Sequence, residues 1–141
     1  MIWGRRKKCE EAVNDLFRKY HSDYEQNLRF KISGVDEKFT LEGLPISTVV
    51  VNEKLNVMYD YIDKLVDFVF QSLKQDFPEF PLKDCKEFIK STVENEYEKL
   101  PDSAKIWLAQ ACLAQPLAIE QYRKTILERL EQTKMDIERR E

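Results

Sequence analysis

The chain has 141 residues, of which 43% are hydrophobic and 35% are charged, and its formal net charge is −3. This length supports a single domain over residues 1–141, since a chain of this size buries roughly 68–70% of its unfolded surface. The apolar content argues against disorder, and the slightly acidic charge gives no support to a dedicated binder of duplex DNA. With only three glycines and five prolines, the chain has few turn residues for an all-β sandwich, so the predicted fold class is mainly α.

The cysteines and the single histidine do not match the common zinc sites. Cys9, Cys85 and Cys112 are far apart, no C-x-x-C pair exists, and His21 is the only histidine. Free thiols of this kind are typical of a reducing compartment, so we expect a cytoplasmic protein. We also expect no cofactor and no metal ion.

Residues 1–8 combine an aromatic residue with a dense basic cluster. The segment is too short to hold the apolar core of a signal peptide before its first arginine. An aromatic side chain beside basic residues is typical of segments that lie on an anionic membrane surface, and the same charges suit a nucleic-acid backbone. The alternative is a flexible, soluble terminus. The residues predicted to contact an anionic surface are Trp3, Arg5, Arg6, Lys7 and Lys8.

Apolar residues recur at three- and four-residue steps from Cys9 to Leu28, which predicts an amphipathic helix. His21 lies on this helix among acidic and phenolic neighbours, and Glu25 shares its face one turn later. A histidine beside a carboxylate suits general-base catalysis, so an enzyme that uses His21 with nearby carboxylates is one hypothesis. No nucleophile or glycine-rich phosphate loop accompanies the pair, and i, i+4 pairs are commonly surface interactions. We therefore expect His21 to be dispensable for the function of the protein.

Residues 28–43 allow two interpretations. Apolar and polar residues alternate on both sides of Gly34, which predicts a β-hairpin between the first two helices with Phe30 opposite Leu41. The alternative is that the first helix continues to Ile32 and ends at Gly34, which would serve as a left-handed cap. Short alternating runs do not distinguish a strand from a helix end.

A second helix is predicted between Ser47 and Phe77, with Ser47 or Thr48 as its N-cap. Its apolar residues fall on three sides of the helix, so two of its turns require cover almost all round. This pattern places the second helix at the centre of the fold. The residues that we assign to the core are Ile62, Leu65 and Val69.

Two further helices are predicted in the second half of the chain. A segment with two prolines ends the second helix, and a third helix follows from about Leu82 to Leu100. The fourth helix runs from Ser103 to about Glu138. Pro116 falls inside its pattern and removes one helical hydrogen bond, so we expect a kink or a break at this position.

Beyond Pro116 the last helix carries a narrow apolar stripe between mixed charges. Such a stripe is typical of a coiled-coil seam, formed within the chain or with a second chain. We expect residues 120–141 to project from the bundle and a homodimer to cover the seam. The competing interpretation is that the first or the second helix of the same chain covers it. The predicted partner-binding residues are Ile119, Tyr122, Ile126, Leu130 and Ile137.

The sequence therefore predicts a bundle of about four helices with a hairpin at 28–43 as one interpretation. Its predicted function is that of a non-enzymatic adaptor that binds another protein, including a second copy of itself. The alternatives are a peripheral protein that uses its basic arm on a membrane surface or nucleic acid, and an enzyme built around His21. No small-molecule substrate is implied.

Overall fold

The computed structural model describes the backbone of residues 2–43 and 48–141, and the side chains of residues 4–43 and 48–141. Helices make up almost all of these residues, and none of them lies in a strand. The predicted helical bundle is confirmed. Its helices, in chain order, are α1 (Ile2–Leu41), α2 (Thr48–Asp76), α3 (Leu82–Glu98), α4 (Leu100–Gln110) and α5 (Pro116–Arg139).

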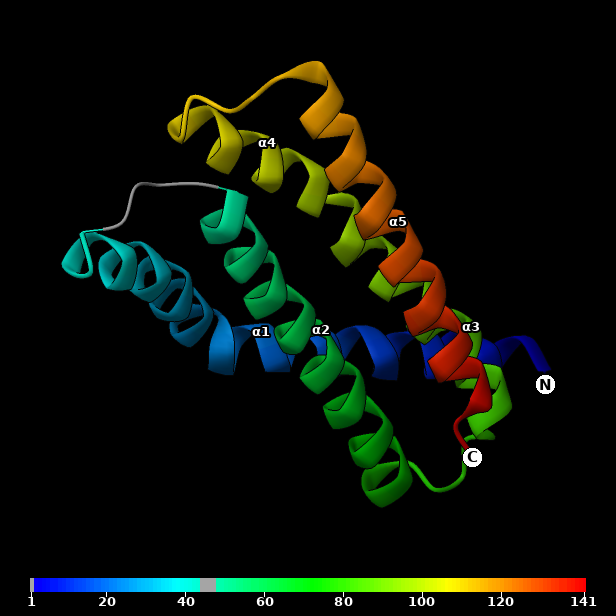
Figure 1. Ribbon diagram of the computed structural model, residues 1–141. Coiled ribbons are helices and arrows are strands. Elements are labelled where there is room, and N and C mark those ends of the chain that lie inside the picture. The colour runs from blue at the N-terminus through cyan, green and yellow to red at the C-terminus, as the bar shows by residue number, and fades with distance from the viewer. Residues whose placement is uncertain (1, 44–47) are drawn as a thin grey trace.

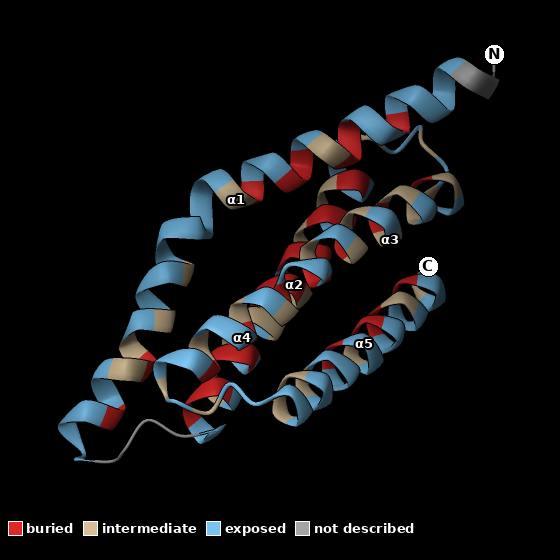
Figure 2. Ribbon diagram, turned by 90° about the horizontal axis from the view of Figure 1, so that it is seen from above, coloured by how far each residue is buried: buried red, intermediate tan, exposed pale blue. Residues whose placement is uncertain are grey.

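α2 lies at the centre of the bundle, as its apolar pattern predicts. It packs against α1, α3 and α4, while α5 packs against α3 and α4. Seen from above, α1 runs along one side, α5 along the other, and α2, α3 and α4 lie between them (Figures 1 and 2). Ile62, Leu65 and Val69 are 1%, 0% and 0% exposed, so their assignment to the core is confirmed. Helix α2 begins at Thr48, and the alternative N-cap Ser47 lies outside the described residues.

The predicted β-hairpin is wrong, because α1 continues through residues 28–41 as a helix. Apolar residues of this segment also recur at helical spacing. Val35 and Phe39 lie four residues apart, and both are buried against Val50 of α2. Phe30, which the hairpin would have paired, is 70% exposed. The alternative end at Gly34 is wrong too, since a single glycine costs a helix only about 1 kcal/mol, which tertiary packing offsets.

α1 ends at Leu41, and the glycine that follows this end is Gly43 instead of Gly34. The Gly43 amide donates a hydrogen bond to the Thr40 carbonyl at 3.1 Å, and Gly43 has a φ of 68°. Glycine adopts this left-handed conformation without a steric penalty, which makes it the common residue after a helix. The two candidate glycines are therefore distinguished by the backbone conformation that each position requires.

The second half of α1 is attached to α2 by a small apolar cluster and two ion pairs, one of which joins Lys38 to Glu53 across 3.9 Å. Val35, Phe39 and Val50 form this cluster apart from the main core. Lys54 is only 3% exposed, and its ammonium nitrogen lies 2.8 Å from an Asp36 carboxylate oxygen. Such pairing is what a buried ammonium requires, because an unpaired buried charge is costly.

Pro116 breaks the predicted fourth helix into α4 and α5. It stands at the first turn of α5, where its missing N–H is no loss because that group has no intrahelical partner. Before it, Cys112 adopts a φ of 58°, and the Leu113 amide donates to the Leu108 carbonyl at 2.8 Å. This arrangement is a Schellman turn with cysteine where glycine is usual. The chain thereby reverses, and α5 returns along α3 and α4 (Figure 1).

The C-terminal helix does not project from the bundle. α1, with 40 residues, is the longest helix, and α5 has 24. The last turns of α5 are held down by Lys90, which pairs with Glu138, and by Lys86, whose ammonium donates to the Glu138 carbonyl at 2.9 Å. The buried residues of α5 all lie from Ile126 onward, and this part of α5 runs beside the other helices (Figure 2).

Candidate functional site

Most of the predicted partner-binding stripe is covered within the chain. Ile126, Leu130 and Ile137 are 2%, 5% and 0% exposed and belong to the main core. Ile119 and Tyr122 are half-buried against the same core. The structure therefore favours a seam covered within the same chain. The cover comes from α3 and α4, and not from the first or second helix as the competing interpretation expected. Self-association stays a prediction, but these buried side chains do not offer an exposed seam for it.

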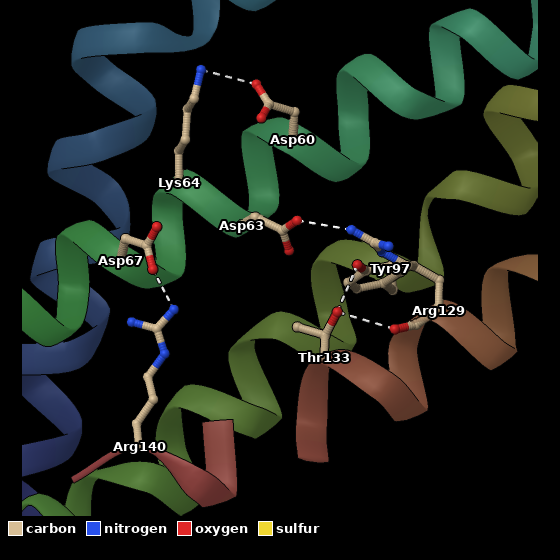
Figure 3. Close-up of polar contacts among 8 residues, drawn as sticks. All are labelled: Asp60, Asp63, Lys64, Asp67, Tyr97, Arg129, Thr133 and Arg140. Carbon is tan, nitrogen blue, oxygen red and sulfur yellow. Dashed lines mark hydrogen bonds and ion pairs between the residues drawn. The ribbon is translucent and has the colours of Figure 1, made fainter. Parts of the chain in front are cut away.

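On its other side, α5 meets α2 through polar side chains (Figure 3). A guanidinium nitrogen of Arg129 lies 2.8 Å from a carboxylate oxygen of Asp63, and Arg140 pairs with Asp67. Nearer the start of α5, the Tyr122 hydroxyl donates a hydrogen bond to Oδ1 of Asn52 in α2 at 2.7 Å. Apolar packing thus holds one face of α5, while charges and hydrogen bonds fix its position against α2.

Arg129 is the centre of this polar network. Its guanidinium carbon lies 5.3 Å from the centroid of the Tyr59 ring. The Thr133 hydroxyl donates its only proton to the Arg129 carbonyl at 3.0 Å, so the Tyr97 hydroxyl must donate to Thr133 across 2.9 Å (Figure 3). Two buried atoms, Tyr59 Oη and Arg129 Nε, have no hydrogen-bond partner among the described residues.

Three carboxylates along α2 set the charge of this network. Burial holds the pKa of Asp63 above its ordinary value even though Arg129 acts to lower it, and Asp67 and Asp60 add to the rise. Burial acts to lower the pKa of Arg129, but Asp63 and Tyr97 outweigh it and raise the pKa overall. Arg129 therefore stays charged. The network can position α5 against α2.

An apolar cleft of about 360 Å³ opens between α5 and the junction of α3 with α4. Its floor is formed by Tyr97, Ile126 and Leu130, whose side chains are almost fully buried. Leu127 stands at its edge and is 57% exposed. The cleft volume is near the lower end of the range of ligand pockets, which is roughly 300–1,000 Å³. It has room for a few apolar side chains.

The rim of this cleft carries carboxylates that are not neutralised. Glu98, the last residue of α3, and Asp102, in the first turn of α4, are both exposed. Neither has an ion-pair partner within the described part of the chain. On the α5 side, the Arg123 guanidinium lies 3.6 Å from a carboxylate oxygen of Glu120. The rim is therefore acidic along α3 and α4.

The sequence pattern did not identify the cleft. It found Ile126 and Leu130 as apolar positions but missed Leu127, Glu98 and Asp102. The sequence did carry a signal for Leu127. This large apolar residue lies outside the stripe, among the charged residues of the helix. No local pattern could bring residues 98–102 beside α5, because that contact depends on the chain reversal before Pro116.

His21 does lie beside a carboxylate, but not the one that its sequence neighbours suggest. Its Nδ1 lies 2.7 Å from the Tyr61 hydroxyl and its Nε2 lies 2.8 Å from a carboxylate oxygen of Glu96. Glu25, the expected partner, interacts with Arg29 at 3.3 Å on the surface. Burial raises the pKa of Tyr61 well above its ordinary value, so the phenol stays protonated. Both ring nitrogens of His21 thus link helices, which suits a structural role.

The His21–Glu96 pair gives the fold a pH dependence. Burial acts to raise the pKa of Glu96, but the hydrogen bond and charge of His21 outweigh it and lower the pKa overall. A carboxyl whose pKa is lower in the folded state stabilises the fold above its unfolded pKa, and this stabilisation is lost as pH falls. We therefore expect Glu96→Gln to unfold at lower urea concentration than the wild type near pH 6. The gap should close as the pH falls below 4.5, the ordinary pKa of the carboxyl.

Urea unfolding at a series of pH values measures this effect. Glu25→Gln is the matched control, because Glu25 is an exposed carboxylate whose surface pair with Arg29 contributes little. A gap for Glu96→Gln that stays constant from neutral to acidic pH would contradict the assigned role of the His21–Glu96 pair.

A second groove, also of about 360 Å³, lies between α1 and α2. Its aromatic residues surround Tyr20, whose ring centroid is 4.6 Å from that of Tyr24 and 5.4 Å from that of Phe68. Its acidic residues are already paired, since Asp60 binds Lys64 at 2.9 Å and Asp67 binds Arg140. This groove has less free charge of one sign to select a partner than the cleft beside α5.

The N-terminal arm is not a separate flexible segment, because residues 2–8 form the first two turns of α1. The side chains of Arg5, Arg6, Lys7 and Lys8 are exposed there, whereas the side chain of Trp3 lies outside the described residues. Cys9 follows and is fully buried. The basic cluster is therefore accessible on a helix, and its binding to an anionic membrane surface or nucleic acid stays a prediction.

Comparisons of the chain with protein-family models, with curated proteins and with solved structures each found no match. The fold defines a mainly helical bundle with clefts on its surface. Within the described residues, no group of three or more histidines, cysteines and carboxylates is arranged to hold a metal ion. None of the described helices combines the length and the apolar content that a membrane crossing demands.

Proposed function

We propose that this chain is a non-enzymatic helical protein that binds a segment of another protein in the cleft beside α5. The observation that carries the proposal is the exposed Leu127 at the edge of an apolar floor built from Ile126 and Leu130. Grooves of this kind bind apolar side chains that a partner presents at helical spacing. The non-enzymatic part of the proposal is supported by the His21 contacts, which engage both ring nitrogens within the fold.

A neutral amphipathic peptide tests this proposal. A peptide of about 14 residues, four helical turns of leucine on one face and glutamine on the other, should shift the amide resonances of residues around Leu127 and Asp102. Leu127→Glu should abolish these shifts, because a carboxylate at the edge of the apolar floor has to be desolvated when the peptide binds. NMR titration of the full chain measures both results.

Leu117→Glu is the matched control, since Leu117 is also an exposed leucine of α5, 72% exposed, but does not line the cleft. This variant should bind the peptide as the wild type does. Peptide-induced shifts that map to the groove between α1 and α2, or that survive Leu127→Glu, would overturn the proposed site.

A further inference from the structure

We propose that the partner segment is a basic amphipathic helix, with apolar side chains in the cleft beside α5 and lysines or arginines facing its acidic rim. This inference rests on the proposed function, because it names the chemistry of the segment that the same cleft binds. It follows from the kind of walls that the cleft has and from the charges that those walls leave unpaired.

The walls of the cleft favour a helix over an extended peptide. They are formed by side chains of α5 and of the α3–α4 junction, and residues 97–102 and 123–130 contribute all of the lining side chains. A peptide in β conformation binds chiefly through main-chain hydrogen bonds to a free strand edge, and none of the described residues lies in a strand. A helix needs only apolar anchors at three- and four-residue steps, which an apolar floor along α5 accommodates.

The free charges of the rim favour basic residues. Glu98 and Asp102 are four residues apart on the same side of the cleft, and both are exposed without an ion-pair partner among the described residues. Arg123, the one cation that lines the cleft, is already paired with Glu120 at 3.6 Å. A lysine or arginine of the partner would therefore meet two free carboxylates, whereas an acidic partner would meet repulsion.

Two peptides that differ only in charge test the inference. Both are about 14 residues long, with leucine on one face, and the other face carries lysine in one peptide and glutamate in the other. We expect NMR titration of the full chain to show tighter binding of the lysine peptide at the cleft. The affinity ratio expected from two exposed ion pairs is roughly 2- to 30-fold, and it should fall as salt is added.

A charge-reversed variant makes the test specific to the rim. Glu98→Lys combined with Asp102→Lys should reverse the preference, so that the glutamate peptide binds more tightly than the lysine peptide. The matched control is Glu37→Lys with Glu42→Lys, which changes the net charge by the same amount at exposed positions of α1 and the turn after it. This control should keep the wild-type preference. A lysine peptide with a proline in its middle turn should bind weakly, because proline breaks the helix.

The outcomes separate this inference from the proposed function. Equal binding of both peptides at the cleft overturns the basic-partner inference and leaves the proposed function standing. No shift at the cleft with either peptide overturns both. A preference for the lysine peptide that survives reversal of Glu98 and Asp102 also overturns the inference, because the selecting charge must then lie elsewhere.

Discussion

Leu65→Ala should destabilise the fold by roughly 2–5 kcal/mol, the usual cost when a buried leucine is cut back to alanine. Leu65 is 0% exposed and lies in the middle of α2, which packs against three other helices. The surroundings therefore cannot easily collapse into the cavity, which places the expected cost toward the upper part of that range. Each kcal/mol lowers the melting temperature by roughly 2–4 °C in chains slightly longer than this one.

Thermal and urea unfolding of the variant and the wild type measure this cost. Leu117→Ala is the matched control, because the same substitution at a 72% exposed position should change stability by less than about 0.5 kcal/mol. If Leu65→Ala melted at the wild-type temperature, the central position of α2 would be wrong.

Ile126→Asp should have a still larger effect, with more than about 4 kcal/mol of stability lost. Ile126 is 2% exposed and belongs to the main core. The substitution removes apolar burial and places an unpaired carboxylate in the core, so α5 should detach or the fold should be lost. Total stabilities are typically only about 5–15 kcal/mol, which makes unfolding at room temperature a realistic result.

The neighbouring residue supplies the control for this prediction. Leu127→Asp should cost only about 1 kcal/mol, mainly through its lower helix propensity, because Leu127 is 57% exposed. Circular dichroism and urea unfolding compare the two variants. If Ile126→Asp stayed folded and merely lowered the mass seen by light scattering, α5 would be a dimer seam, contrary to the packing described above.

Light scattering also tests self-association of the wild type. The monomer mass is 16.8 kDa. A particle of that mass at micromolar concentration would contradict the predicted homodimer. Twice that mass would support it, and the interface would then have to lie outside the buried part of the α5 stripe.

The apolar spacing alone predicted the helical bundle and its central helix. Three-sided apolar patterns such as that of α2 have few explanations other than burial, so Ile62, Leu65 and Val69 could be placed without coordinates. The secondary structure of residues 28–43 could not be predicted in this way, because their apolar positions fit a period of two and a helical period at once. The presence of α2 as a surface for Val35 and Phe39 decided the outcome, and that surface is a tertiary feature.

The candidate site was harder to predict for the same reason. The carboxylate beside His21 comes from Glu96, 75 residues away, and the rim of the cleft comes from the junction of two helices. Contacts between residues so far apart in the sequence depend on how the helices pack against one another. The spacing of apolar residues within one helix does not specify that packing. The α5 stripe shows the limit most clearly, since its pattern predicted a covered seam but could not say whether the cover was a second chain.

Helix α1 is continuous in its backbone, yet its two halves pack into different parts of the molecule. The first half packs into the main core. The second half is held by the cluster of Val35, Phe39 and Val50 and by two ion pairs, Lys54 with Asp36 and Lys38 with Glu53. Segments with so few buried contacts open at lower free energy than the core that they join. We therefore expect the turns after residue 28 to exchange their amide hydrogens and to unravel without global unfolding. The helical circular dichroism of this protein should then be lost in two steps. Only the step in which α2 unfolds measures the stability of the fold.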